Sequence, residues 1–388
     1  MLIDNNEVDY SVACIGVIVE KQNNAIECEL YFRPDKGWLK QSWLALETRS
    51  EPNIFLSWLW IGSWFECFVD AHYVIEARRN NEVIGLGVIV PSTDSYFRYF
   101  KRVPYYLHRV GDALRDQAWI EFNDFLMLAG EEEEIRHKMI AVVMEEIVGN
   151  GKFVIGASHS HILQTSAAQY AVDSTWETFT YQVDLDKLRC QGQSLSQYIS
   201  RSARYQIMRS LRRYQEYGEV TISTAHTVED ALLYFSMADP LHVKRWGDQL
   251  GQSGFRNPHF IRFHKALIRS GVPKGHVMLH KIMAGDELIA IMYNFHWHGN
   301  VTFYLSALNY DMPGEHLKPG LVSHYSLINQ AMDEGFHRYD FMGGVARYKE
   351  TFSNSNTSLS VYEMSKSKTV LALKNKLRYV KHQLSSCR

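Results

Sequence analysis

The stretch HVMLHKIMAGDELIAIMYNFHWHGNVTFYLSAL, residues 276–308, decides the fold class. It contains three runs rich in apolar, β-branched and aromatic residues, at 276–282, 288–297 and 301–308. The short turn sequences AGDE and HGN separate these runs. Such runs joined by tight turns are typical of neighbouring antiparallel strands. The stretch therefore predicts a three-stranded meander in a mostly antiparallel sheet.

A helix and then a further strand are predicted directly after this meander. The helix, KPGLVSHYSLINQAMDEGF, has Pro319 near its first turn and Gly335 at its end, which are start and stop signals. The strand, HRYDFM at 337–342, places Asp340 on the face opposite its aromatic neighbours. Because apolar residues flank this carboxylate, we expect it to be half-buried. It must then have a charged partner or a raised pKa.

The segment GGVARYKETF, which follows this strand, gathers groups that suit chemistry. Gly343 and Gly344 allow a sharp turn and the close approach of a ligand to the backbone. Arg347 and Lys349 are then expected beside the end of the sheet, over its opening. A structural salt bridge from one of these cations to Asp340 is the alternative to a catalytic role.

The first half of the chain predicts a similar order of elements. Its clearest signal is HYVIEARRNNEVIGLGVIVP, in which the turn RNNE joins two β-branched runs of a hairpin. A later helix begins with the run Glu131–Glu134, which we interpret as structural because carboxylates suit the dipole at a helix N-terminus. We expect strands at 12–19, 26–32 and 122–129, the hairpin at 72–91, and helices at 37–50, 54–69 and 131–151.

The second half adds a strand and a long helix before the meander. The helix, SLSQYISRSARYQIMRSLRRYQEYG, ends at Gly218. Two units with helices, a meander, a helix and a strand predict an α+β (mixed α/β) fold of two tandem domains, each a mostly antiparallel sheet flanked by helices. We expect the domains to be 1–188 and 189–388. Further strands are expected at 178–188 and 220–224, and further helices at 194–218, 228–238 and 258–270.

Composition excludes several classes of protein. The chain has 388 residues, of which 46% are hydrophobic and 22% charged, and its net charge is −2. These values are typical of a globular protein without a global attraction to nucleic acid or anionic lipid. Its five cysteines are scattered and form no CxxC pair, which favours a reducing compartment, the cytoplasm. We expect neither a signal peptide nor a membrane-spanning helix.

Several pieces of the sequence together resemble a known superfamily. The order of elements in residues 276–343 is similar to the core of the GNAT-superfamily acyltransferases. GDELIA, the PG that opens the following helix, YDFMGG and YKETF resemble the CelD-type branch found with bacterial polysaccharide biosynthesis, which is related to the Fem aminoacyltransferases. The resemblance covers most of residues 38–353 and implies two tandem GNAT-like domains.

The resemblance also implies an activity. It points to an acyl-CoA-dependent N-acyltransferase, in the first place an acetyltransferase, acting on an amino group of a bacterial surface polysaccharide or cell-wall precursor. The alternatives are a Fem-like transferase that uses aminoacyl-tRNA, with nucleic acid as a partner, and a non-catalytic GNAT-like module of a polysaccharide synthesis complex. Members that use acetyl-CoA carry a Q/R-x-x-G-x-G/A loop, whereas this chain has GEHLKPGLV. Acetyl-CoA is therefore implied by the superfamily and not by a phosphate motif.

The start of the helix at Pro319 is the predicted donor site. Backbone N–H groups of Gly320, Leu321 and Val322 are expected to point out of the helix N-terminus, and Lys318 adds a positive charge beside them. Such a site suits the pyrophosphate of an acyl-CoA. An ordinary helix start, in which proline and glycine only set the turn, is the alternative interpretation.

Four residues form the predicted catalytic group. Asp340 is the candidate base, Tyr348 a candidate proton donor, and His324, which follows the PG turn, a second candidate base. In the resemblance, Lys349 matches the lysine of the family's YK pair, a contact to a phosphate or carboxylate of the acceptor. Direct attack of an amine on a thioester requires no protein nucleophile, which agrees with the lack of a Ser–His–Asp or Cys–His signature.

Acceptor binding is predicted for a second set of residues. Arg204 and Arg212 are eight positions apart on one face of the arginine-rich helix, and a basic face can hold an anionic precursor or tRNA. A solvated face is the alternative for these arginines. Tyr304 and Arg347 complete the predicted acceptor set. The His-x-His pairs in SHSH and HWH have a spacing that can hold zinc, but no third ligand is evident, so we expect no metal.

Overall fold

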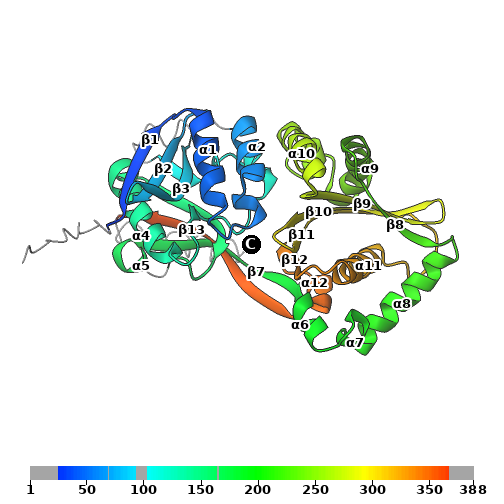
Figure 1. Ribbon diagram of the computed structural model, residues 1–388. Coiled ribbons are helices and arrows are strands. Elements are labelled where there is room, and N and C mark those ends of the chain that lie inside the picture. The colour runs from blue at the N-terminus through cyan, green and yellow to red at the C-terminus, as the bar shows by residue number, and fades with distance from the viewer. Residues whose placement is uncertain (1–24, 69, 93–102, 164–165, 367–388) are drawn as a thin grey trace, which may run out of the picture.

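One continuous sheet organises the whole molecule. The computed structural model describes residues 25–68, 70–92, 103–163 and 166–366, and the strand expected at 12–19 lies outside them. The strand order is β1-β2-β3-β4-β6-β13-β7-β12-β11-β10-β9-β8, with β5 paired to β3. Figure 1 shows that the sheet runs through two halves that lie side by side, with helices on both faces. This arrangement confirms the predicted mixed α+β fold.

The first half is built around a hairpin whose turn explains its register. Asn80 and Asn81, between β2 and β3, have φ angles of 51° and 66°, as a type I′ turn requires. The strands of this half are β1 (Glu27–Phe32), β2 (Tyr73–Arg79), β3 (Glu82–Pro91), β4 (Pro104–Leu107), β5 (Leu126–Met127) and β6 (Lys152–His159). Its helices are α1 (Lys36–Glu47), η1 (Ile54–Leu56), α2 (Trp58–Phe68), η2 (Arg115–Ala118), α4 (Glu132–Val143), η3 (Met144–Val148) and α5 (Ser166–Gln169).

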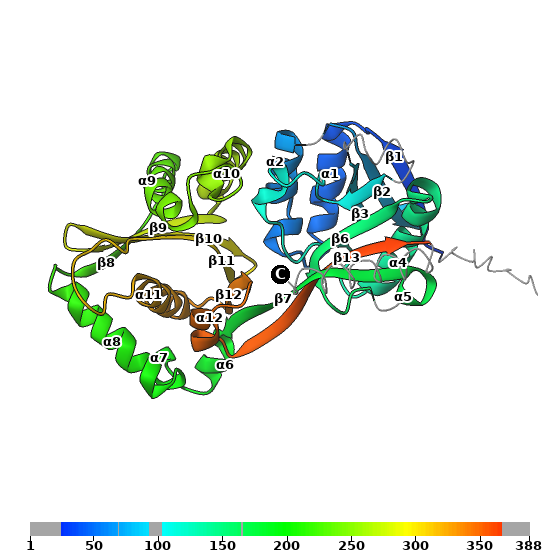
Figure 2. The same cartoon turned by 180° about the vertical axis from the view of Figure 1, so that it is seen from behind.

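The second half contains the predicted meander, which is confirmed. Its strands are β8 (Val220–Thr224), β9 (Val277–Ala284), β10 (Glu287–Trp297), β11 (Asn300–Leu308) and β12 (Arg338–Gly343). Its helices are α6 (Leu185–Cys190), α7 (Leu195–Tyr198), α8 (Arg201–Gln215), α9 (Val228–Trp246), η4 (Gly254–Arg256), α10 (Pro258–Gly271), η5 (Val272–Lys274), α11 (Pro319–Asp333) and α12 (Arg347–Phe352). Figure 2 shows α9 and α10 on one face of this part of the sheet and α11 on the other.

Two long strands connect the halves. β7 (Ala171–Asp184) pairs with β12 and with β13 (Ser355–Ser365), and β13 also pairs with β6. The chain thus returns to the sheet of the first half after completing the second. The sequence did not predict β13, and its return means that no single cut in the sequence separates the two parts of the sheet. The boundary at residue 188 stays a prediction.

Several predicted elements differ in extent: the helix expected at 228–238 continues to Trp246, and the strand expected at 178–188 begins at Ala171 and gives way to α6 at Leu185. Two further differences have local reasons. The helix expected at 194–218 is divided into α7 and α8, because Ile199 is extended and the Ser200 side chain accepts a hydrogen bond from the Ala203 N–H at 3.1 Å. The strand expected at 122–129 is limited to β5. Its first part is held elsewhere, since the Asn123 N–H donates to the Ala157 carbonyl of β6 at 2.9 Å.

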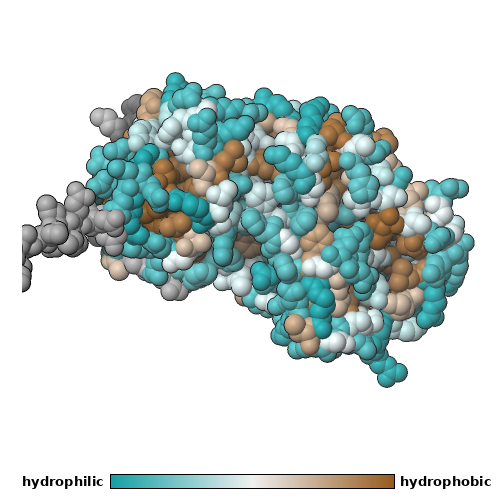
Figure 3. Space-filling view, in the orientation of Figure 1, coloured by the Kyte–Doolittle hydropathy of each residue, from teal (hydrophilic) through white to brown (hydrophobic). Residues whose placement is uncertain are grey.

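A shared hydrophobic core joins the two halves. It contains Trp43 and Trp60 from α1 and α2 and Phe263 from α10, and the rings of Trp60 and Phe263 are 4.8 Å apart. A separate core fills the space between α8, α11 and the opposite face of the second half's sheet. Figure 3 shows that one face of the surface is mainly hydrophilic, with hydrophobic patches on both halves. In the described ranges, no helix is both long and apolar enough to cross a membrane.

Each half contains one pair of parallel strands joined across a helix. β4 pairs with β6 over three residues, from Pro104 with Lys152 to Tyr106 with Val154, and α4 lies in the connection. β11 pairs with β12 over three residues, from Asn300 with Arg338 to Thr302 with Asp340, and α11 lies in the connection. Beyond these short ladders the two strands of each pair are no longer hydrogen-bonded to each other.

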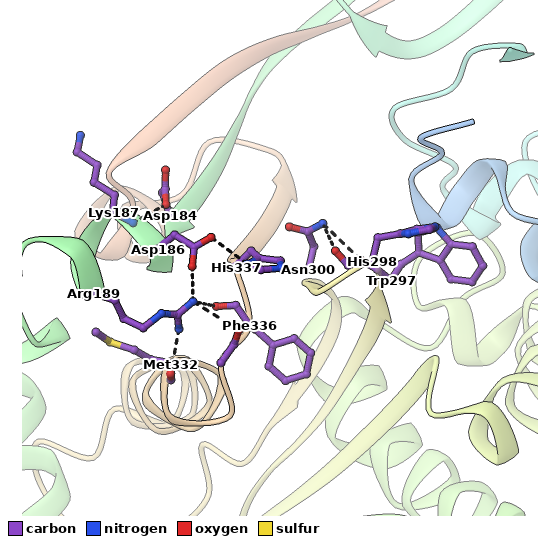
Figure 4. A network of polar contacts seen from close by, with 11 residues as sticks. Asp184, Asp186, Lys187, Arg189, Trp297, His298, Asn300, Met332, Phe336 and His337 are labelled. Carbon is purple, nitrogen blue, oxygen red and sulfur yellow. Dashed lines mark hydrogen bonds and ion pairs between the residues drawn. The ribbon is translucent and has the colours of Figure 1, made fainter. Parts of the chain in front are cut away.

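A polar network fixes the paired end of β11 and β12. The Asp186 carboxylate contacts Arg189 at 2.5 Å and His337 Nδ1 at 2.9 Å, and Arg189 also donates to the Met332 carbonyl at 3.0 Å (Figure 4). The His337 N–H donates to the carbonyl of Gly299, in the β10–β11 turn, at 2.8 Å. These bonds tie α6, the end of α11 and the meander together, so the divergence of the two strands is confined to their other ends.

Candidate functional site

The divergence of β11 and β12 creates an opening in the sheet, which we call the strand opening. After Thr302 and Asp340 the two strands have no further ladder bonds. On its other side, β11 has a bulge at Tyr304, because Tyr293 pairs with Leu305 and Asn294 with Phe303. The backbone of β11 beyond Thr302 therefore presents an edge to the strand opening, where a ligand can bind it.

A cavity of about 270 Å³ lies at the start of α11, beside the strand opening. We call it the helix-start cavity. Its cationic side chains are Lys318 and Arg245, and no carboxylate is among its lining residues. Pro319 lacks an N–H, and the next two residues have no acceptor within the helix, so Gly320 and Leu321 offer free N–H groups. The remaining lining residues are Trp246, Ser306, Leu308, Tyr310, His324 and Tyr348.

Three of the four predicted donor-site residues line this cavity. They are Lys318, Gly320 and Leu321. Val322 does not, because its N–H donates to the Lys318 carbonyl at 3.1 Å and its side chain is fully buried in the core. Its predicted contact with the donor therefore lacks a free hydrogen-bond donor.

His324 and Tyr348 come together on the wall of the helix-start cavity. Their rings are stacked, with centroids 4.8 Å apart, and His324 Nδ1 lies 3.2 Å from the Tyr339 hydroxyl. Burial, with a smaller contribution from Lys349, lowers the pKa of His324 to about 3. The imidazole is therefore neutral near pH 7. Burial also raises the pKa of Tyr348 well above its usual value, so the phenol keeps its proton.

Asp340 lies on the opposite face of the sheet from these rings. It is half-buried, as predicted, and its Oδ1 accepts from the Met342 N–H at 2.6 Å and from Thr180 Oγ1 at 3.4 Å. In the part of the chain that the structure describes, no ion pair joins it to Arg347 or Lys349, although Lys349 acts on it electrostatically. Burial raises the pKa of Asp340 to about 6, although its hydrogen bonds and nearby cations oppose the shift.

Lys349 and Glu121 both bind the backbone at the end of β12. Lys349 is 6% exposed, and its Nζ donates to the carbonyls of Gly343 at 2.6 Å and Met342 at 3.3 Å. Glu121 reaches from the first half to accept the Gly343 N–H at 2.6 Å. A Cβ on Gly343 would lie 3.1 Å from the Glu121 carboxylate, so this glycine makes room for it. Burial raises the pKa of Glu121 to about 7 and lowers the pKa of Lys349.

A second cavity, of about 450 Å³, lies between the two halves on the Asp340 side of the sheet. We call it the interhalf cavity. Asn53 and His159 from the first half line it together with Arg338 and Asp340 of β12 and Gln182 of β7. Its other polar lining residues include Glu51, Asp124, Glu132, Thr180, Asn300, Thr302 and Thr357. The wall thus offers many hydrogen-bonding groups, with Asp340 at the sheet.

The four predicted acceptor residues are elsewhere. Arg204 donates to the Ser196 carbonyl at 2.9 Å, and it and Arg212 lie on α8, where they line neither cavity. Arg347 is exposed on α12 and also lines neither. Tyr304 is buried, and its hydroxyl donates to the Ala118 carbonyl at 2.5 Å. None of the four lines either cavity, and their role in acceptor binding stays a prediction.

Sequence reasoning missed Glu121 and the residues at the end of α9. Glu121 is an isolated carboxylate in a loop, and only the packing of the two halves brings it to Gly343. Arg245 and Trp246 end α9, far from α11 in the sequence. Nothing in the sequence around Glu121 indicates a functional site. The arginine followed by tryptophan at the end of α9 is a weak signal of one. Within the described residues, no group of three or more side chains is arranged to hold a metal ion.

Comparison with known proteins agrees with this geometry. Residues 201–350 match the model of the acetyltransferase (GNAT) domain. A comparison with curated proteins found no match. FemX has a similar fold, with a TM-score of 0.54 and 10% identity, over 85% of this chain and 96% of FemX.

Two further solved structures have the same fold. One is a C-terminal domain assigned to a lysylphosphatidylglycerol synthetase from Agrobacterium fabrum, with a TM-score of 0.53, 10% identity, and coverage of 88% of this chain and 95% of that one. The other is L-PGS from Bacillus licheniformis, with a TM-score of 0.50, 9% identity, and coverage of 88% and 94%. These likenesses concern the fold, whereas the match of residues 201–350 to the GNAT acetyltransferase domain supports an acyltransferase.

Proposed function

We propose that the protein is an acyl-CoA-dependent N-acyltransferase of the cytoplasm, with acetyl-CoA as its first candidate donor. The acceptor is an amino group on a precursor of a bacterial surface polysaccharide or cell wall, as in the CelD-type branch that the sequence resembles. The observation that carries this proposal is the pair of cavities on opposite faces of one strand opening. One cavity is cationic, and the other is polar, with Asp340 and further carboxylates among its lining residues.

The helix-start cavity suits the donor. Free N–H groups of Gly320 and Leu321 at the positive end of a 15-residue helix, with Lys318 and Arg245 beside them, match the charge of a pyrophosphate. The cavity adjoins β11, whose unpaired edge can hold an extended pantetheine arm by backbone hydrogen bonds. The thioester then reaches the strand opening.

The interhalf cavity suits the acceptor. Its polar side chains can bond the hydroxyl groups of a sugar, and Asp340 lies where an amine entering the strand opening would pass. In the reaction, the amine nitrogen forms a bond to the thioester carbonyl carbon, and the bond from this carbon to sulfur breaks. Asp340 accepts the amine proton, and Tyr348, which lines the helix-start cavity, is our candidate to protonate the departing thiolate.

An aminoacyl-tRNA donor is the second candidate, and one observation favours it. α8 carries five arginines and lies against the start of α11, where Ser210 Oγ accepts the Lys318 N–H at 2.9 Å. Among these arginines, Arg201, Arg212 and Arg213 are exposed. A basic face next to the donor cavity could hold the phosphates of an RNA acceptor stem.

The direct test measures transfer with each donor. The purified protein is incubated with acetyl-CoA and a set of amino sugars and their nucleotide-linked forms, and released thiol and acetylated product are quantified. We expect coenzyme A release that depends on the amino sugar. Transfer that occurs only with charged tRNA, and that ribonuclease abolishes, would identify the second candidate. No transfer from either donor, with no thermal stabilisation by coenzyme A at millimolar concentration, would favour a non-catalytic module.

A further inference from the structure

Two large aromatic rings at the rim of the helix-start cavity are left in solvent. Trp246 is 59% exposed and Tyr310 is 55% exposed, and both line the cavity. Trp246 is the last residue of α9, and Tyr310 follows the end of β11. Exposing such rings forgoes the hydrophobic stabilisation that burial would bring, so their position at a cavity mouth suggests a ligand.

The charged side chains that line the cavity beside these rings are both cationic. The Arg245 guanidinium lies 5.4 Å from the centre of the Tyr310 ring, a cation–π contact. Lys318 is the other cation of the lining. The neighbouring carboxylate of Asp311 is already paired with Lys244. A ligand that satisfies this site must therefore present a flat π-system close to negative charge.

We propose that Trp246, Tyr310 and Arg245 form a base-binding subsite that recognises the adenine of a nucleotide-borne acyl donor. The inference rests on the proposed function, and it adds that the enzyme selects donors by their nucleotide. With the phosphates at the start of α11, the base lies at the cavity mouth and stacks on the exposed rings. Coenzyme A and the 3′-terminal adenosine of a charged tRNA share this chemistry. A donor carried on a protein-bound phosphopantetheine lacks the base and leaves the rings unused.

The site is tested by comparing ligands with and without the base on the full chain. Binding of coenzyme A, adenosine 3′,5′-bisphosphate and 4′-phosphopantetheine is measured by calorimetry for the wild type, Trp246→Ala and Tyr310→Ala. Stacking of one base on an aromatic side chain corresponds to an affinity change of about 5- to 150-fold. We expect losses in this range for the two adenine ligands in Trp246→Ala, smaller losses in Tyr310→Ala, and a change below about twofold for 4′-phosphopantetheine.

A matched control and a second arm make the result decisive. Trp176→Ala removes another exposed tryptophan, on β7 and away from the helix-start cavity, and should leave all affinities unchanged. A short RNA hairpin ending in CCA distinguishes the two adenosine sources, since Trp246→Ala should weaken whichever of the hairpin and coenzyme A binds. Unchanged affinity for both in Trp246→Ala and Tyr310→Ala overturns the base subsite even if acyl transfer is found. Adenine-dependent binding without acyl transfer refutes the proposed function and leaves the subsite intact.

Discussion

The two halves of the molecule contain the same arrangement of two parallel strands, which is closed in the first half and open in the second. Each has a short parallel ladder whose strands separate, with a helix in the connection between them. In the first half, the Asn123 amide fills the separation by donating to the Leu107 carbonyl of β4 at 2.8 Å and the Gly156 carbonyl of β6 at 3.3 Å. In the second half, the strands lead instead to the helix-start cavity. One opening is closed by the chain itself, and the other is the one at which we propose that a ligand binds.

The two halves also differ in the charge at the start of the connecting helix, α4 in the first half and α11 in the second. α4 has Glu132, Glu133 and Glu134 in its first turn, and Arg79 pairs with this acidic helix start. α11 has no acidic residue in its first turn and begins after Lys318. An anionic donor is repelled at the first and attracted at the second. The difference supports our proposal that the second half holds the chemistry, while the first half contributes a wall of the interhalf cavity.

The largest expected effect concerns Asp340, which belongs to the last pair of the β11–β12 ladder. The third pair of the ladder is Thr302 with Asp340 in the second half and Tyr106 with Val154 in the first. Asp340→Asn should therefore lower turnover by about 10²- to 10⁴-fold, the range for loss of a general base, with little change in coenzyme A affinity. Because the pKa of Asp340 is raised to about 6 by burial, wild-type turnover should rise with pH through this value, and the variant should lose this dependence.

The control for this prediction is Asp333→Asn, which changes an exposed carboxylate at the end of α11. It should keep wild-type turnover. A wild-type rate and pH profile in Asp340→Asn would remove Asp340 from the chemistry.

The next effect reverses the charge difference between the two helices. Lys318→Glu should weaken coenzyme A binding by about 10- to 100-fold, because it places a carboxylate where we propose that the free N–H groups of Gly320 and Leu321 bind phosphate. The matched variant Glu132→Lys makes the opposite change at the start of α4 and should leave the affinity unchanged. Calorimetric titration of both variants checks the comparison. Equal losses in both, or a loss only in Glu132→Lys, would contradict the assignment of the donor to α11.

A third prediction concerns the closed opening of the first half. Asn123 is fully buried, and its Oδ1 also lies 2.9 Å from His108 Nδ1. Asn123→Ala leaves the carbonyls of Leu107 and Gly156 without this partner, so it should lower the free energy of unfolding by about 1–3 kcal/mol. Denaturant titration measures this loss. Coenzyme A affinity should not change, and a gain of a second binding site would show that the side chain alone had blocked one.

The smallest effect is a pH dependence of stability from Glu121. Because its folded pKa is raised to about 7 by burial, the folded state binds more protons than the unfolded state between the usual carboxyl pKa and about 7. Stability should therefore fall as pH rises through this window. Glu121→Gln can still accept the Gly343 N–H and should flatten the decline, gaining about 1–2 kcal/mol at pH 8. Chemical denaturation at pH 5 and pH 8 tests this, with exposed Glu219→Gln as the control; a decline as large in Glu121→Gln as in the wild type contradicts it.

The sequence allowed prediction of what depends on local pattern. The meander, the Asn80–Asn81 turn and the start of α11 at Pro319 follow from runs of apolar residues and turn chemistry. The half-buried position of Asp340 follows from strand alternation. Ser200 is a typical helix N-cap residue and could have predicted the break between α7 and α8. The apolar stripe continues across this break, which favoured a single helix instead.

What could not be predicted depends on contacts between distant segments. Glu121 meets Gly343, and Asn123 meets Leu107, only after the halves dock. β13 is polar and alternates weakly, and it becomes a strand because β6 and β7 offer it a place between them. Arg204 and Arg212 were predicted to bind the acceptor because the sequence shows a basic face on this helix. The sequence does not show in which direction that face points.

Hydrogen exchange measured by mass spectrometry, with and without saturating coenzyme A, tests the difference between the two halves most directly. If the donor occupies the second half, amides at 303–308 on β11 and at 320–321 on α11 should exchange more slowly with the ligand, while 105–108 and 132–135 stay unchanged. Protection centred on 105–108 and 132–135, or none at either place under saturation, would contradict the assignment of the donor to the strand opening of the second half.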